Sequence, residues 1–174
     1  MKGNKILLAV LLTTLCLGAA AQSRDFRDPG YKGSIALTDQ LGVFVGAETS
    51  HGVMLGRKDF LGLGVGGFVL PKKDEMPVYG QAFVQYRHYF EESGHSMFGE
   101  VKAGLSHAFN YETNESVTYQ DAVLAEPGFG WSWTLGSGNG LSLGLGAIVL
   151  FPFGESRTTN RVLALPKLAV SFDF

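Results

Sequence analysis

An alternation with a period of two residues runs through most of this sequence, and it separates charged from uncharged side chains. Runs bounded by Gly, Pro, Asn and Asp predict eight strands, at residues 31–38, 42–52, 60–70, 78–90, 97–111, 123–134, 141–151 and 161–174. Successive side chains of a strand point to opposite sides. One face of the predicted strands carries no Asp, Glu, Lys or Arg, and the other face holds all the strand charges, namely Lys32, Glu48, Arg87, Glu100, Lys102, Glu126, Arg161, Lys167 and Asp173.

Two architectures use such a pattern: a soluble barrel with the apolar face inside, and a membrane barrel with that face toward lipid. The charged face also carries many glycines, such as Gly62 and Gly144, and bulky residues such as Phe68 and Leu150. These residues make a poor water-facing surface, but they suit the interior of a narrow barrel, which has room for small side chains and a few paired polar ones. The sequence therefore predicts an all-β fold, an eight-stranded antiparallel up-and-down transmembrane β-barrel.

The first residues are typical of a secretory signal peptide. Lys2 and Lys5 precede an apolar run at residues 6–17, and three alanines at 19–21 supply a cleavage site. About a dozen apolar residues are too few for a spanning helix, which needs roughly 20. We expect a signal peptide at 1–21, a short periplasmic N-terminal segment at 22–30 and the barrel at 31–174. Cys16 follows Leu15 instead of a small residue, so we expect it to be removed with the signal and not lipidated.

Composition limits the functions that remain. Two of the 14 basic residues lie in the signal, which leaves 12 basic against 16 acidic residues and a net charge of −4, unsuited to a nucleic-acid surface. Residues 62–67 fit the G-x-G-x-x-G pattern, but the alternation continues to Leu70 where a dinucleotide site needs a helix. No thiol survives processing and no two histidines share a strand face at close spacing. We expect neither a cofactor nor a metal.

Pairs of serine and histidine could indicate a hydrolase. Ser50 and His51 are adjacent on one strand, as are Ser106 and His107, so the members of each pair point to opposite faces. This arrangement prevents the hydrogen bond that a nucleophile and its base require. His88 and His95 have no better placed serine, because Ser96 lies with His95 in a predicted turn. We expect no catalytic residue.

The signal sequence, the glycine-rich alternating segments and the closing segment from Leu168 to Phe174 together resemble the small outer-membrane β-barrel family of the OmpA-barrel and OmpX type. The resemblance covers essentially the whole mature chain. It implies a monomer in the outer membrane of a Gram-negative cell envelope, in contact with membrane lipid and lipopolysaccharide. It also implies recognition by the barrel-assembly machinery through the strand that ends at Phe174. We expect no peptidoglycan-binding domain after that residue.

The family includes structural, adhesive and enzymatic members, so the resemblance does not fix the role. We predict a structural or surface-interaction role, with the longer outer loops at 71–77, 112–122 and 152–160 as contact surfaces for an extracellular partner. Acidic Glu112, Glu115 and Asp121 give the second of these loops its character, and we interpret it as a solvated loop. The alternatives are a small transport pore and a lipid-modifying enzyme. The nearest match to the His-x-Ser-Asn segment of the deacylases, at 107–110, lacks the serine.

Two sets of residues carry specific expectations. If Phe90 faces Met97 across a tight turn, Arg87 lies opposite Glu100, and the closing seam brings Lys32 to Asp173. Four basic and four acidic interior residues then predict a salt-bridged, closed lumen, because a narrow interior tolerates paired ions only; they are Lys32, Glu48, Arg87, Glu100, Lys102, Glu126, Lys167 and Asp173. Aromatics near the periplasmic ends of the strands predict a membrane-interface girdle; they are Tyr31, Tyr86, Phe90, Trp131, Trp133, Phe172 and Phe174.

Overall fold

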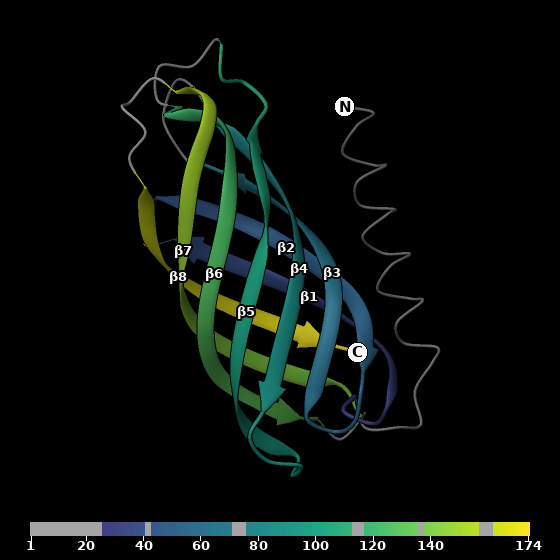
Figure 1. The fold of residues 1–174 in the computed structure, drawn as a ribbon. Helices are drawn as coiled ribbons and strands as arrows, with labels where there is room; N and C mark the ends of the chain where they lie inside the picture. Colours follow the sequence, from purple (N-terminus) through teal and green to yellow (C-terminus); the bar gives the residue numbers. More distant parts are fainter. Residues whose placement is uncertain (1–25, 41–42, 71–75, 113–116, 136–137, 157–161) are drawn as a thin grey trace, which may run out of the picture.

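The computed structural model describes residues 26–40, 43–70, 76–112, 117–135, 138–156 and 162–174, and in them the chain forms one closed barrel (Figure 1). Each strand pairs antiparallel with the next, and β1 pairs with β8 to close the sheet. The predicted signal peptide lies outside the described residues. The eight strands are β1 (Gly30–Gln40), β2 (Phe44–Met54), β3 (Asp59–Val69), β4 (Val78–Tyr89), β5 (His95–Ala108), β6 (Tyr119–Thr134), β7 (Gly140–Ser156) and β8 (Leu163–Asp173).

The apolar face of each strand points outward and the polar face points inward. In β4, Val84 is 49% exposed, whereas its neighbours Phe83 and Gln85 are 5% and 2% exposed. The other strands alternate in the same way, so an apolar surface surrounds the barrel. This arrangement is the inverse of a soluble barrel and confirms the predicted fold class. No helix in the described ranges is long and apolar enough to cross a membrane.

The two ends of the barrel differ. At the end that we call the turn end, residues 55–58, 90–94 and 135–139 connect the strands, and β1 begins and β8 finishes there (Figure 1). The opposite end, the loop end, carries the other connections. There β6 begins at Tyr119 and β7 continues to Ser156, so both strands extend further than the sequence predicted. Asp121 is consequently a strand residue and not part of a solvated acidic loop; Glu115 lies outside the described residues.

The barrel interior is filled in three layers. Apolar side chains pack at the loop end, in a cluster that includes Phe68, Leu124 and Ile148. A second apolar cluster fills the turn end. Charged and polar side chains occupy the space between them. We call the second group the turn-end cluster; it consists of Phe26, Met54, Phe60, Tyr89 and Phe98.

Glycine allows the strands to approach closely where the sheet curves. A Cβ atom on Gly104 would lie 2.0 Å from the backbone oxygen of Ala82, and one on Gly130 would lie 2.2 Å from that of Leu143. Neither backbone atom can move without disturbing the strand pairing, so only glycine fits at these two positions.

Candidate functional site: an ion network across the barrel interior

Seven charged side chains from five strands meet in the middle layer of the barrel. They alternate with apolar lipid-facing residues along their strands, and this alternation turns all seven inward. Their carboxylates and cations contact one another in one continuous chain of ion pairs. We call this group the ion network; it consists of Glu48 of β2, Arg87 of β4, Glu100 and Lys102 of β5, Glu126 of β6, and Lys167 and Asp173 of β8.

One half of the ion network centres on Arg87. The register places Arg87 directly opposite Glu100, as the sequence predicted. Both Nε and Nη2 of Arg87 lie 2.7 Å from Oε2 of Glu100, while Nη1 lies 3.4 Å from Oδ1 of Asp173. Ser142 donates a hydrogen bond to the second oxygen of Asp173, at 2.5 Å. The guanidinium of Arg87 therefore joins the neighbouring strand β5 to the distant strand β8.

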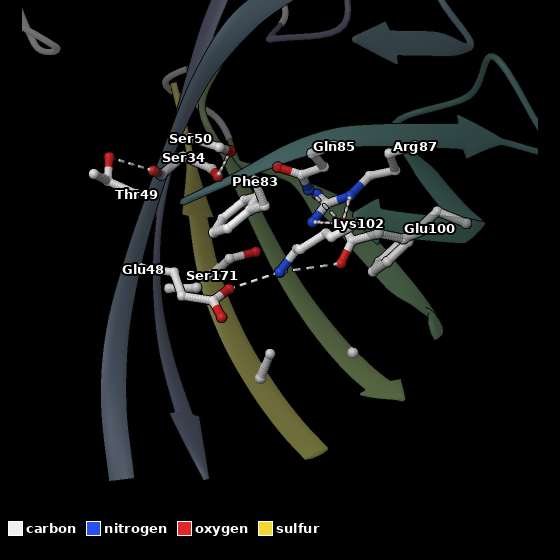
Figure 2. Close-up of a pocket in the computed structure, with 14 residues that line it drawn as sticks. Ser34, Glu48, Thr49, Ser50, Phe83, Gln85, Arg87, Glu100, Lys102 and Ser171 are labelled. Carbon is white, nitrogen blue, oxygen red and sulfur yellow. Dashed lines mark hydrogen bonds and ion pairs between the residues drawn. The ribbon is translucent and has the colours of Figure 1, made fainter. Parts of the chain in front are cut away.

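The other half is a closed ring of two lysines and two glutamates. Lys102 Nζ lies 2.6 Å from Glu48 and 3.1 Å from Glu126. Lys167 Nζ contacts the same two carboxylates, with 2.7 Å to Glu126 and a short contact to Glu48. A further contact of 3.5 Å from Lys102 to Glu100 connects the ring to Arg87. Figure 2 shows Lys102 lying between Glu48 on one wall and Glu100 on the other.

Aromatic rings connect the ion network to the apolar layers on both sides. The guanidinium of Arg87 lies 4.4 Å from the ring centroid of Phe98, in the turn-end cluster. On the loop side, Lys102 lies 5.1 Å from the ring of Phe83 and Lys167 lies 5.7 Å from that of Phe68. The cavity beside Arg87 and Lys102 and the one beside Lys167 each have a volume of only about 20 Å³, room for about one water molecule. This part of the lumen is therefore filled.

The eighth residue, Lys32, lies at the closing seam. The seam forms between β1 and β8, as expected, but its register places Ser34 opposite Asp173 and leaves Lys32 two residues further along. Arg87 and Ser142 both contact the Asp173 carboxylate. Sequence reasoning missed the contact between Arg87 and Asp173 across the lumen, because β4 and β8 are not neighbours in the sheet.

The comparisons with known proteins bear on the fold of the chain. The sequence matches no protein-family model and none of the curated proteins. Among solved structures, Neisserial surface protein A matches with a TM-score of 0.58 at 11% identity, over 82% of this chain and 92% of that one. The outer membrane enzyme PagL matches with a TM-score of 0.50 at 14% identity, over 82% of this chain and 98% of that one.

Both proteins are small eight-stranded barrels of the outer membrane. This chain has their fold. The apolar exterior described above agrees with an outer-membrane location, because in such barrels the outward face meets lipid.

Two residues that precede β1, Phe26 and Arg27, pack into the turn end of this outer-membrane barrel, and we call them the plug. Phe26 and Arg27, just before β1, are 2% and 0% exposed. Arg27 lies over the rings of Phe26 and Tyr89, at 5.4 and 5.6 Å, and donates hydrogen bonds to Glu91 O and to Thr134. The sequence assigned these residues to a periplasmic segment and gave no sign of the plug, because no alternation precedes Tyr31.

The aromatics assigned to the membrane interface all lie on the outer face, near the turn end. Tyr31 and Phe90 are 64% and 58% exposed, Tyr86 and Trp131 are also exposed, and Trp133, Phe172 and Phe174 are partly exposed. At the loop end the structure adds a second set of exposed rings, Phe109, Phe151 and Phe153. The apolar belt of the barrel therefore has aromatic side chains near both edges.

The four histidines lie on the outside of the barrel, away from the ion network. His88 contacts Asp59 at 2.8 Å and His107 contacts Asp121 at 2.9 Å, in both cases through Nδ1. The position two residues after His107, where the deacylase segment has serine, holds Phe109, whose ring packs 5.1 Å from the imidazole. Ser50 and Ser106 point inward and are 2% exposed.

Proposed function

We propose that this protein is an integral outer-membrane barrel with a structural or surface-interaction role, a closed lumen and no catalytic activity. The continuous apolar exterior supports insertion into a bilayer, since an apolar band facing lipid is what such barrels present. The loop end would then face the outside of the cell and the turn end the periplasm, because outer-membrane barrels have short periplasmic turns.

The filled interior carries the proposal of a closed lumen. A solute that crossed the barrel would have to displace the loop-end cluster, the ion network, and then the plug at Phe26 and Arg27. Removing one partner from a buried ion pair leaves an uncompensated charge, so the ion network opposes opening. Eight strands in any case leave an interior just wide enough for side chains, whereas aqueous channels belong to barrels of about 16 to 18 strands.

Conductance tests this proposal directly. The mature protein, refolded in detergent and added to planar lipid bilayers at neutral pH, should give no stable single-channel steps. A 16-stranded porin prepared in the same way serves as the positive control. Reproducible steps of porin size from the pure protein would replace this proposal with the transport pore.

The outward position of the histidines supports the absence of catalysis. A serine nucleophile must lie within hydrogen-bonding distance of its base, and in the described residues the side chains bonded to His51, His88 and His107 are Tyr31, Thr49, Asp59 and Asp121. Phe109 occupies the place where a deacylase-like serine would stand. Incubation of the purified protein with lipid A, followed by mass spectrometry, should show no released acyl chain; release would establish the lipid-modifying enzyme instead.

Its proposed partners are membrane lipid, lipopolysaccharide and the barrel-assembly machinery. Phe172 and Phe174 at the end of β8 lie with their ring centroids 6.4 Å apart, and together they give the last strand the aromatic ending that assembly would recognise. We also propose that the loop end holds the contact surface for an extracellular partner.

A further inference from the structure

The aromatic ring of Phe174, the residue after β8, lies over the closing seam on the outer face of the barrel. The backbone of Phe174 pairs with that of Gly33, and each N–H donates to the other residue's carbonyl oxygen at 2.8 Å. A Cβ atom on Gly33 would lie 2.6 Å from two atoms of the Phe174 ring, so the ring occupies the space directly over this glycine. Gly33 is accordingly buried, although Tyr31 on the same face of β1 is 64% exposed.

The ring reaches beyond β1 to a histidine on β2. His51 lies opposite Gly33 in the register of β1 and β2, and its imidazole meets the Phe174 ring edge to face, with the centroids 6.2 Å apart. Hydrogen bonds join the imidazole Nδ1 to the Tyr31 hydroxyl at 2.6 Å and Nε2 to the Thr49 hydroxyl at 3.1 Å. Phe174 therefore bridges three strands, β8, β1 and β2. We call Gly33 and His51 the ring seat.

The seam between β1 and β8 is the most demanding strand pairing of the barrel. In the described residues it joins 34–39 of β1 to 168–173 of β8, whereas β1 pairs with β2 along its whole length, 30–40. The two seam strands also stand at opposite ends of the barrel sequence, so their meeting carries the largest loop-closure entropy. A side-chain contact that adds to this short pairing therefore contributes more to closure than a similar contact does within a hairpin.

We propose that docking of the Phe174 ring on the ring seat closes the barrel. Gly33 is a positioning residue in this step, because the absence of a side chain lets the ring cross β1 and contact His51 while β8 pairs. The atoms that a Cβ at residue 33 would meet belong to the outer part of the ring. A side chain at that position therefore displaces the ring and leaves the backbone pairing without the additional contact.

The loop end offers a similar glycine away from the seam. A Cβ atom on Gly80 of β4 would lie 2.6 Å from the ring of Phe109, which follows β5 as Phe174 follows β8. The strands β4 and β5 are consecutive in the sequence, so their pairing does not depend on closure of the barrel. Gly80→Ala is thus the matched control for Gly33→Ala, with the same methyl group under the same kind of ring.

Disulfide trapping measures closure, because the predicted mature chain has no cysteine of its own. Leu37→Cys with Val170→Cys reports the seam, and Val84→Cys with Ala103→Cys reports the hairpin of β4 and β5; both are pairs of outward-facing register partners. The protein is diluted from urea into phosphatidylcholine vesicles, and samples are oxidised with copper phenanthroline at successive times. We expect Gly33→Ala to slow trapping of the seam on the order of tenfold and to leave trapping of the hairpin unchanged.

Phe174→Ala tests whether the ring and the glycine act together. It should slow trapping of the seam as much as Gly33→Ala does, and the double variant should be no slower than either single variant, because both substitutions remove the same contact. Gly80→Ala should close at the wild-type rate. If the effects of Gly33→Ala and Phe174→Ala add instead, the two residues act separately and the ring seat has no role in closure.

Three further results would overturn the proposal. Seam trapping at the wild-type rate in Gly33→Ala would show that the ring docks only after closure, as a contact with a merely structural role does. Equal slowing by Gly80→Ala would show a general effect of an added methyl group. Equal slowing of the hairpin and the seam in Gly33→Ala, including a variant that does not fold, would show an effect on folding as a whole. Loss of the seam product alone is the expected result in its extreme form.

The experiment contains no assembly machinery and measures no conductance. Its outcome is therefore separate from those of the proposed recognition by that machinery and of the proposed closed lumen.

Discussion

Each lysine of the ion network is surrounded by two or more carboxylates. Lys102 lies within 3.5 Å of Glu48, Glu100 and Glu126. Burial of an ammonium is costly, and the cost is offset only when opposite charges complete its contacts. Removal of one such cation leaves carboxylates that repel one another in a space too small for solvating water.

Lys102→Met should therefore destabilise the barrel strongly. We expect the free energy of unfolding, measured in urea with vesicle-inserted protein, to fall by about 3 to 5 kcal/mol. Lys58→Met is the matched control, because Lys58 is exposed and its 3.9 Å contact with Glu92 is worth about 1 kcal/mol or less. Similar losses for the two variants would contradict the importance of the ion network.

Gly104 and Gly67 make a second comparison between single residues. Gly104→Ala would force a Cβ atom to within 2.0 Å of a backbone oxygen, whereas Gly67→Ala adds one on the outer face with nothing within 4 Å. We expect Gly104→Ala to lower the free energy of unfolding by about 1 to 3 kcal/mol, as for an overpacked interior. Gly67→Ala should stay near the wild type. A tolerated Gly104→Ala would mean that β4 and β5 are further apart than described.

Each strand has one face toward the lipid and one face toward the barrel interior. In β5, Val101 is exposed on the outside while Lys102, the next residue, is buried in the ion network. A shift of register by one residue would exchange the two faces, placing charges in lipid and valines in the polar layer. The alternation thus fixes the register as firmly as the hydrogen bonds do.

A charge on the lipid face should be costly in the middle of a strand and tolerated at its end. Val101→Arg should lower the free energy of unfolding in vesicles by about 2 to 4 kcal/mol, the cost of a charge near the bilayer midplane. Leu55→Arg, in the turn that follows β2, should cost about 1 kcal/mol or less. Equal costs at the two positions would contradict the placement of the membrane around the barrel.

For the whole molecule, three layers of side chains fill the interior, and we propose that each of them obstructs the lumen. The plug is the layer that can be removed with least effect on the strands, because Phe26 and Arg27 precede β1. Phe26→Ala should lower the free energy of unfolding by about 3 to 5 kcal/mol, the usual loss for a buried Phe.

The same variant should remain non-conducting in planar bilayers, because the ion network and the loop-end cluster still fill the lumen. Porin-sized steps from Phe26→Ala, with none from the wild type, would show that the plug alone closes the barrel. The stability measurement confirms that the substitution reached the packed interior.

Alternation by two residues was sufficient to determine the strand number, the outward apolar face and the inward direction of the seven charges of the ion network, because side-chain direction in a strand depends on position alone. The pairing of Arg87 with Glu100 could also be predicted from the sequence, because a short turn sets the register of adjacent strands. The strand boundaries at the loop end were harder to predict from the sequence. Gly and Pro clusters mark turns, but the pairing of His107 with Asp121 continues β6 into the predicted loop.

Only the tertiary structure decided which residues meet across the lumen and at its ends. The contact of Arg87 with Asp173 and the packing of Arg27 on Tyr89 both join segments that are not neighbours in the sheet. Such contacts depend on the stagger and curvature with which the sheet closes. A period of two residues specifies which way a side chain points, but it contains no information about what it meets on the opposite wall.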